Sequence, residues 1–255
     1  MSHHIVEADS LRYSYPDGTA ALAGISFRIA HGESVALVGE NGAGKSTLLQ
    51  HFTGCLFPSG GLLKIGGLSV DRQNLSAVRR AVGMVFQNPD DQLFMPTVFE
   101  DVAFGLLNLG VREAELEGRV TGALETVGAA HLKGRPPYRL SQGEKRAAAI
   151  AGVLAMSPDI LVMDEPTSSL DPMSRRRLID LLKTFKHTKI IATHDLDFAL
   201  ETCRRTIVIH RGVVTADGPT AEVFRDAELL KRSRLEAPPS MQKCPACGVA
   251  VKAGL

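Results

Sequence analysis

The sequence predicts an α/β protein with a parallel-sheet core, an antiparallel strand-rich start and a helical insertion. After Leu140, apolar strands alternate with helices, which is typical of a parallel sheet covered on both faces. The opening third instead has short runs of alternating apolar and polar residues, separated by Gly and Pro turn signals. From Thr97 to about Gly128, apolar residues recur at steps of three or four, which indicates helix.

The expected elements follow in order. Strands are expected at 25–29, 34–38, 62–65 and 82–86, then the helical region, helix 142–156, strand 159–164, helix 172–186, strand 188–193, helix 195–202 and strand 205–210. The last residues contain Pro and Gly without a period. We therefore expect a domain over 1–235, with a helical subdomain at about 88–156, and a tail over 236–255.

Composition excludes several classes of protein. The chain has 255 residues, 44% of them hydrophobic, so a sizeable core can be buried. A net charge of +1 gives no electrostatic footprint for nucleic acid or lipid. The best apolar run, 147–156, is about half the roughly 18 residues that span a bilayer, and the start lacks a secretory signal pattern. Four cysteines, with Cys55 and Cys203 in apolar segments, favour the cytoplasm.

A glycine-rich nucleotide motif follows the strand at 34–38. Residues 39–47 read GENGAGKST, which fits G-x-x-x-x-G-K-[ST] and leads into a helix-like segment, so the context predicts a P-loop. The glycines at 39, 42 and 44 let backbone N–H groups turn toward phosphates. Lys45 supplies charge to the β and γ phosphates, and Ser46 offers a hydroxyl to Mg²⁺. A glycine turn without function is the alternative.

Three polar residues end two of the predicted parallel strands. Asp164 and Glu165 close one strand, at the edge where open parallel sheets bind ligands. Asp164 can hold Mg²⁺ through water, and Glu165 can polarise an attacking water as a general base. His194 ends a second strand, where it can contact the γ phosphate. Helix capping by the acids and a structural histidine are the alternatives.

The segment LSQGEKRAAAIAG at 140–152 resembles the LSGGQ signature of ABC-type ATPases. The other motifs of that family occur in order around it: Tyr15, the P-loop, Gln87 after a strand, Asp164-Glu165, SSLD at 168–171, and His194. The resemblance implies a P-loop NTPase of the ABC ATPase type, with a RecA-like parallel-sheet core, an antiparallel β subdomain and a helical subdomain.

The resemblance also implies a site shared by two subunits, in which ATP and Mg²⁺ lie between the P-loop of one and the signature of the other. It assigns catalytic roles to Glu165, His194 and Gln87, and Mg²⁺ binding to Ser46, Gln87 and Asp164. Nucleotide contacts are expected from Tyr15, Gly39, Asn41, Gly42, Ala43, Gly44, Lys45, Ser46, Thr47, Ser141, Gly143 and Asp171. Tyr15 is expected to stack on adenine in preference to Tyr13. Gln142 and Glu144 depart from the usual signature.

Three stretches, at 86–94, 97–110 and 135–156, are similar to the ATPases of energy-coupling-factor importers, most of all the CbiO type of cobalt and nickel importers. This implies an ATPase dimer, expected to consist of two copies of this chain, bound to a transmembrane coupling subunit and a substrate-binding membrane subunit. No nucleic acid is expected. The chain should lie at the cytoplasmic face of the cell membrane, touching it only through those partners.

Alternatives within and outside this class stay open. A vitamin importer of the same class shares the three stretches. A DNA-repair or chromosome-structuring ABC ATPase is disfavoured, because no sustained heptads separate Lys45 from Ser141. An exporter ATPase and a regulatory module without turnover are further alternatives. Cys244 and Cys247 resemble half of a zinc site, with a thiol-bearing tail as the bland alternative.

The segment MVFQNPDDQLFMPTVFEDVAFG at 84–105 carries Phe94, Met95 and Phe99 in or beside a predicted loop. Rings in a loop either pack into the core or contact a partner. Because Gln87 precedes them, the resemblance favours an apolar groove for a helix of the transmembrane subunit, with Asp90 and Asp91 at its rim.

Overall fold

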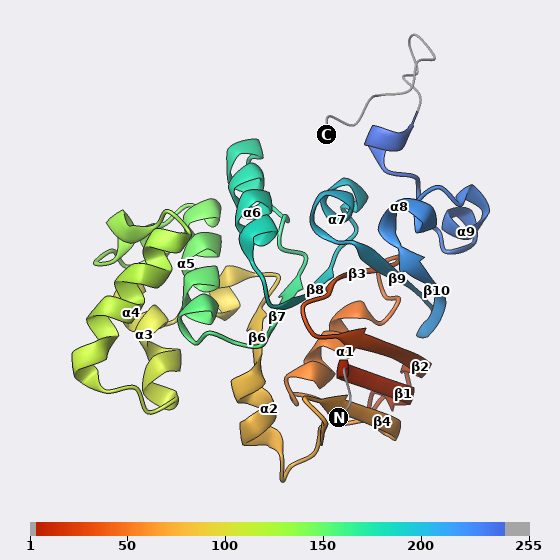
Figure 1. The fold of residues 1–255 in the computed structure, drawn as a ribbon, viewed down its shortest axis with the longest axis horizontal. Helices are drawn as coiled ribbons and strands as arrows, with labels where there is room; N and C mark the ends of the chain where they lie inside the picture. The colour runs from red at the N-terminus through yellow and green to blue at the C-terminus, as the bar shows by residue number, and fades with distance from the viewer. Residues whose placement is uncertain (1–3, 243–255) are drawn as a thin grey trace.

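The computed structural model describes residues 4–242, which form two sheets and a helical subdomain (Figure 1). The larger sheet has the order β10-β9-β3-β8-β7-β6. Its strands are β3 (Ser34–Val38), β6 (Val82–Val85), β7 (Ile160–Asp164), β8 (Thr188–Ala192), β9 (Arg205–His210) and β10 (Val213–Pro219). All neighbouring pairs are parallel except β9 and β10, so the sheet presents a common carboxyl edge at β3, β7 and β8.

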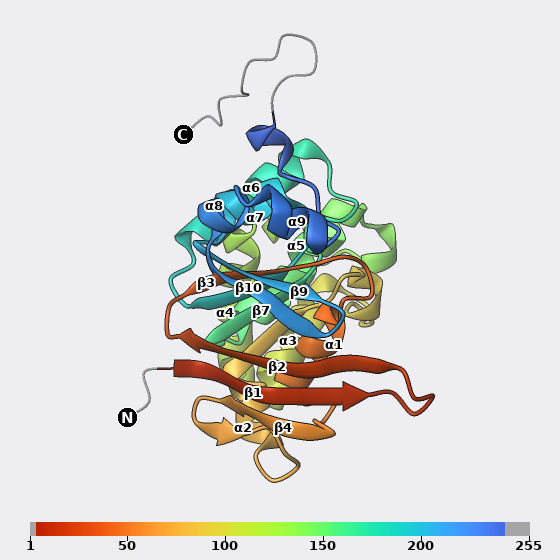
Figure 2. The same ribbon diagram turned by 90° about the vertical axis from the view of Figure 1, so that its right-hand side faces the viewer.

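The smaller sheet is antiparallel and has the order β2-β1-β4-β5. Its strands are β1 (His4–Ser14), β2 (Ala20–Ala30), β4 (Gly60–Ile65) and β5 (Leu68–Ser69). It covers one face of the parallel sheet together with α1 (Lys45–Phe52), while helices cover the other face (Figure 2). Those helices are α6 (Pro172–Thr184), α7 (Leu196–Thr202), α8 (Thr220–Val223) and α9 (Ala227–Arg232).

Alternation along β3 shows how both faces are filled. Val35 and Leu37 belong to the apolar cluster shared with the antiparallel sheet, whereas Ala36 and Val38 belong to the cluster under the helices. Successive side chains of a strand point to opposite faces, so a strand covered on both sides is apolar throughout. This confirms the parallel, doubly covered sheet expected from the sequence.

The helical subdomain has its own apolar core, which is separate from the two clusters of the sheet. It contains α3 (Val98–Asn108), α4 (Glu113–Thr126) and α5 (Gln142–Ala155), with short turns η1 (Pro89–Asp91), η2 (Ala130–Leu132) and η3 (Pro137–Arg139). Gly110, with φ of +78°, separates α3 from α4, so the expected helical region is two helices. The longest of these three helices has 14 residues.

Some elements were absent from the sequence prediction or differ in length. The predicted helix over 172–186 ends at Thr184, because the backbone of Phe185 is extended, and the Lys189 ammonium donates to the carbonyls of Leu182 and Phe185 at this end. The unpredicted elements are β1, β5, β10, α2 (Leu75–Ala81), α8, α9, η1, η2, η3 and η4 (Pro239–Met241). Cys55, placed in an apolar segment by the sequence, is exposed.

The segment after α9 contacts the domain before the description ends at residue 242. The Ser240 backbone N–H donates to the Asp197 carboxylate of α7 at 3.3 Å, and its hydroxyl also bonds that carboxylate. Ala237 and Met241 pack against the cluster under the helices. The first residues of the predicted tail therefore lie on α7, while the boundary at 235 stays a prediction. Cys244 and Cys247 lie outside the described residues.

Candidate nucleotide site

The P-loop joins β3 to α1, and its outer glycines have no room for a side chain. A Cβ on Gly39 would lie 2.2 Å from the carbonyl oxygen of Ile209, and one on Gly44 would lie 2.5 Å from that of Ala21. Gly44 also has φ of +104°, in the region that favours glycine. Backbone N–H groups can therefore turn toward phosphates. The other predicted contacts lie along this loop and the first turn of α1: Asn41, Gly42, Ala43, Lys45, Ser46 and Thr47.

Lys45 is buried within the loop that it is predicted to serve. Its ammonium donates to the carbonyl oxygens of Gly39 at 2.8 Å and Glu40 at 3.2 Å. Burial lowers the pKa of Lys45, while the negative charges of Glu165 and Asp164 oppose this shift. In the loaded site, the Lys45 ammonium would donate to phosphate oxygens, and here it donates to the loop carbonyls instead. The lysine is thus already placed where phosphates would lie.

Asp164 ends β7 and is 6% exposed. Its Oδ1 is buried and has no hydrogen-bond partner within residues 4–242. Burial raises the pKa of this carboxyl, although a hydrogen bond from Ser46 works against the rise. A cavity of about 700 Å³ brings Asp164 together with Ser46 and Gln87. An unpartnered carboxylate oxygen, a hydroxyl and an amide oxygen fit Mg²⁺, a cation that prefers oxygen ligands.

Replacing Asp164 with Asn is expected to stabilise the nucleotide-free chain at neutral pH. The folded pKa lies above the unfolded one, so the carboxyl favours folding below the unfolded pKa, and this contribution is lost as pH rises through the folded pKa. At pH 7 the ionised group therefore costs stability, and we expect Tm to rise by a few degrees. Thermal melts of both chains from pH 4 to pH 8 measure this. A difference in Tm that shrank with rising pH would contradict the assignment.

Glu165 and His194 meet between the ends of β7 and β8. His194 Nδ1 lies 2.8 Å from Glu165 Oε2, and the His194 backbone N–H donates to the same oxygen at 3.2 Å. Glu165 is buried, with its backbone at φ of +43°, and its N–H donates to the Ala192 carbonyl. A positive φ at a residue other than glycine is found at functional sites. The structure thus brings together Glu165, the predicted base, and His194, the predicted contact to the γ phosphate.

Tyr15 lies beside the first turn of α1. Its hydroxyl is 2.9 Å from Thr47 Oγ1, and its ring meets the edge of Tyr13 at a centroid distance of 5.1 Å. Tyr13 also contacts the buried His51 ring at 4.9 Å, so it is held between two rings. This arrangement agrees with the choice of Tyr15 over Tyr13 for adenine, a role that stays a prediction.

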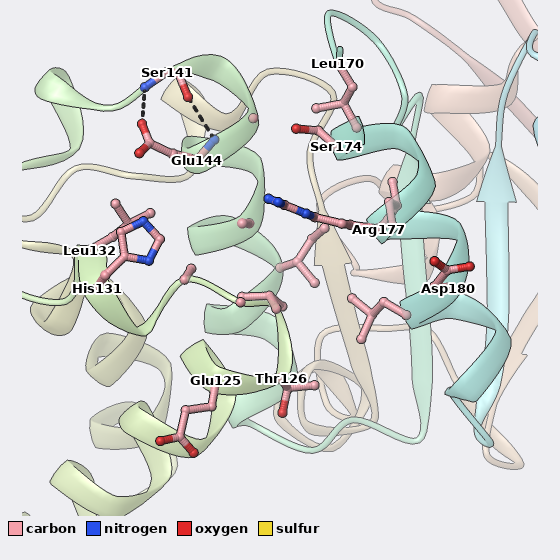
Figure 3. A pocket seen from close by; sticks show the side chains of 18 of the residues that line it. Glu125, Thr126, His131, Leu132, Ser141, Glu144, Leu170, Ser174, Arg177 and Asp180 are labelled. Carbon is pink, nitrogen blue, oxygen red and sulfur yellow. Dashed lines mark hydrogen bonds between the residues drawn. The ribbon is translucent and has the colours of Figure 1, made fainter. Parts of the chain in front are cut away.

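The signature motif forms the start of α5 (Figure 3). Ser141 is the N-cap, and its hydroxyl accepts from the Glu144 backbone N–H at 3.3 Å. The Glu144 carboxylate accepts from the Ser141 N–H at 2.8 Å, which lowers the pKa of Glu144. Glu144, one of the two residues that depart from the usual signature, therefore completes a capping box with Ser141.

A cavity of about 770 Å³ separates the signature end of α5 from α6 (Figure 3). Ser141 and Gly143 line one side, and Ser174 and Arg177 line the other. Asp171 caps α6 by accepting from the Ser174 N–H at 3.0 Å. The residues that line this cavity belong to α4, α5, α6 and the turns beside them, and the P-loop is not among them. Ser141 and Gly143 thus line a different cavity from the P-loop, whereas Gln142 of the signature lines the cavity that contains Ser46.

A sequence profile described as ABC transporter matches residues 22–168. The chain belongs to the ABC transporter family. A Geobacter sulfurreducens protein, provisionally named an ABC transporter ATP-binding protein, is 65% identical over 97% of this chain and 100% of its own length. The energy-coupling factor transporter ATP-binding protein EcfA of Methanothermobacter thermautotrophicus is 48% identical over 92% of this chain and 77% of its own length.

Solved structures agree with this assignment. The structure of cbiO1 from Clostridium perfringens, part of the ABC transporter complex cbiONQ, has a TM-score of 0.80 and 42% identity, over 91% of this chain and 94% of that one. A dimeric ATP-binding cassette in a post-hydrolysis state with ADP and Pi has a TM-score of 0.76 and 27% identity, over 84% of this chain and 98% of that one. The ABC ATPase fold, the energy-coupling-factor resemblance and ATP hydrolysis are confirmed.

Proposed function

We propose that this ATPase powers an energy-coupling-factor importer of cobalt or nickel ions, as a head-to-tail dimer of two copies beneath its membrane subunits. The observation that carries the transport role is an exposed aromatic pair beside the loop of Gln87. The similarity to cbiO1 supports the metal importer. No helix within residues 4–242 is long and apolar enough to cross a membrane, so contact with the membrane is assigned to partner subunits.

The separation of Ser141 and Gly143 from the P-loop of the same chain supports a dimer. Ser141 and Gly143 line the cavity between α5 and α6, and no P-loop residue lines it. In a head-to-tail pair, the α5 N-terminus of one copy would face the γ phosphate held by the other, where its N–H groups favour an anion. Asp171 would lie in the loop that crosses the interface. Two ATP molecules would then join the two copies.

Within each site, the residues of this chain have distinct roles in hydrolysis. Lys45 and the P-loop amides bind the phosphates, and Ser46, Gln87 and Asp164 would hold Mg²⁺, which supplies charge neutralisation when bound. The Glu165 carboxylate accepts a proton from the attacking water. His194 orients that carboxylate through the 2.8 Å contact and can reach the γ phosphate because its imidazole is exposed.

The coupling surface is defined here as Phe94, Phe104 and Leu107. Phe94 is 63% exposed, and its ring meets that of Phe104 edge-on at a centroid distance of 5.0 Å. Phe104 and Leu107 lie three positions apart on α3, and both are exposed. We propose that an apolar helix face of the transmembrane coupling subunit binds here.

The loop predicted from sequence is only partly available to such a partner. Phe99 packs against the core of the helical subdomain, with the Lys133 ammonium 5.3 Å from its ring, so local packing accounts for this ring. Asp90 is exposed and pairs with Lys145 at 2.6 Å. Phe99 is therefore less available to a partner than expected, and Phe104, on α3, is the exposed ring beside Phe94.

Replacing Phe94 and Phe104 together by Ala is expected to lower uptake by roughly 10- to 30-fold, because apolar anchors carry most of the affinity at interfaces. Hydrolysis by the isolated chain should not change, since neither ring touches the site. Uptake of radioactive cobalt or nickel into cells that express the complete transporter measures the first effect. A matched pair, Leu62→Ala with Leu68→Ala, removes two exposed leucines from the antiparallel sheet. Equal loss of uptake in both double variants would refute the coupling surface.

A vitamin importer of the same class is the second candidate, because the membrane subunits select the substrate. Co-purification of this chain with its membrane subunits, followed by uptake assays with Co²⁺, Ni²⁺ and vitamins, distinguishes the two. Uptake of a vitamin, with no uptake of Co²⁺ or Ni²⁺, would reject the metal importer and keep the ATPase role. A chromosome-structuring ATPase has less support, since the longest helix between the P-loop and α5 has 14 residues.

A further inference from the structure

Arg146 is a buried cation on α5 that contacts the loop of Gln87. It is 3% exposed and lies five positions after the signature serine, Ser141. Its two terminal nitrogens donate to consecutive backbone carbonyls, one to Phe86 and the other to Gln87. The planar fork of a guanidinium suits two neighbouring acceptors in a way that a single ammonium does not. Arg146 thus joins the signature helix to the backbone of a predicted catalytic residue.

The surroundings of Arg146 are those of the reaction site. Arg146 lines the same cavity of about 700 Å³ as Ser46, Gln87 and Asp164. Burial lowers the pKa of its guanidinium, and the nearby Asp164 carboxylate acts in the opposite direction. Burying a cation is costly unless it is paired and hydrogen-bonded. Packing alone would be served at less cost by an apolar side chain, so the charge at this position needs another reason.

Two more contacts connect α5 to the same loop. The Gln92 side chain accepts from the Phe86 backbone N–H at 3.2 Å and donates to the Ala149 carbonyl of α5 at 3.1 Å. Lys145 pairs with Asp90 at the rim of the loop. Of these connections, that of Arg146 is the one made to Gln87 itself. A shift of α5 therefore moves the Gln87 backbone with it.

We propose that Arg146 is a positioning residue for ATP hydrolysis, which holds the Gln87 backbone to the signature helix so that the Gln87 side chain reaches the γ-phosphate site. The inference rests on the proposed role of Gln87. When the signature of α5 engages the nucleotide of the other copy, Arg146 carries that displacement to Gln87 in its own site. The position of Gln87 in each site of the dimer thereby depends on whether the signature of the same copy has engaged the nucleotide of the other site.

The test uses Arg146→Met, which keeps an unbranched side chain close in length to the stem of arginine and removes its charge and donors. We expect kcat to fall by roughly 10- to 100-fold, the effect of misplacing a reacting group by about 1 Å. KM for ATP should stay within about twofold, because Arg146 touches no phosphate. Arg146→Lys should recover part of kcat, and Lys145→Met, which removes only the rim contact, should retain the wild-type value. The measurements use the purified full chain, with ATP binding and thermal melts recorded in parallel.

A double-mutant cycle separates positioning from packing. If Arg146 acts through Gln87, the variant Arg146→Met with Gln87→Ala should lose no more kcat than Gln87→Ala alone. Losses that multiply, or a fall in kcat of Arg146→Met that disappears at a temperature where its folding is restored, would overturn the inference. A wild-type kcat in Gln87→Ala would instead refute the proposed role of Gln87. A wild-type kcat in folded Arg146→Met beside a reduced one in Gln87→Ala would refute the inference alone.

Discussion

Glu165→Gln is expected to lower the rate of ATP hydrolysis by roughly 10²- to 10⁴-fold, the contribution of a positioned general base. The amide can still contact His194, but it cannot accept a proton from water. ATP binding should persist, since the P-loop and Lys45 are unchanged. The ATP-bound dimer should then accumulate, and its mass can be followed by light scattering beside a hydrolysis assay.

Glu228→Gln is the matched control for this variant, because it makes the same change at an exposed position of α9. It should hydrolyse ATP at the wild-type rate. Wild-type hydrolysis by Glu165→Gln would show that another group takes the proton. Loss of ATP binding in Glu165→Gln would show that the carboxylate is needed for the structure of the site.

Gly143→Asp is expected to reduce hydrolysis by roughly 10²-fold or more, since it places a negative charge where an oxyanion of the other copy should bind. The added Cβ would lie 2.8 Å from Ser174 Oγ, so the side chain would also press on the start of α6. ATP binding by the isolated chain should stay within about threefold, because Gly143 lines a cavity that contains no P-loop residue. Nucleotide titration and a hydrolysis assay measure the two effects.

Gly118→Asp introduces the same residue on α4, at a site where a Cβ meets nothing within 4 Å, and should leave both properties unchanged. Mixed dimers give a sharper result. In a mixed dimer, one copy carries Gly143→Asp and the other carries Lys45→Ala. If the arrangement is head-to-tail, the wild-type P-loop of the first copy and the wild-type signature of the second form one intact site. The single pairing that keeps both wild-type halves together should recover hydrolysis. Failure of this mixture would argue against the shared site.

The sequence predicted elements best where one local signal was strong. The strand before the P-loop was found with the bounds of β3, because five apolar-rich residues lie between turn signals. α2 was missed because it has only seven residues and one buried side chain, so it shows no helical period. β10 was missed because it lies at an edge of the sheet and ends at Pro219, in a residue pattern that resembles a loop.

The loop from Gln87 to Phe99 shows a different limit of sequence reasoning. The apolar rings indicated a loop that either packs into the core or contacts a partner, but the sequence did not show which ring would be buried. Phe99 joins the core of the helical subdomain, whereas Phe94 remains exposed against Phe104. The missed residue of the site, Arg146, carried a detectable signal, because this cation lies directly before the apolar run of α5 and is followed there by three alanines.

By itself, the sequence determined the chemistry of this protein: the P-loop, Asp164-Glu165, His194 and the signature serine are local patterns whose spacing reflects short-range backbone geometry. It also determined the alternation of helices and parallel strands over residues 142–210, since buried parallel strands need continuous apolar runs. Only the tertiary structure decided that His194 meets Glu165, that Ser141 lines a cavity between α5 and α6, and that Arg146 bonds the Gln87 loop. The contact of His194 with Glu165 joins residues 29 positions apart, and that of Arg146 with Gln87 joins residues 59 positions apart. Both depend on how separate elements pack, which no local period encodes.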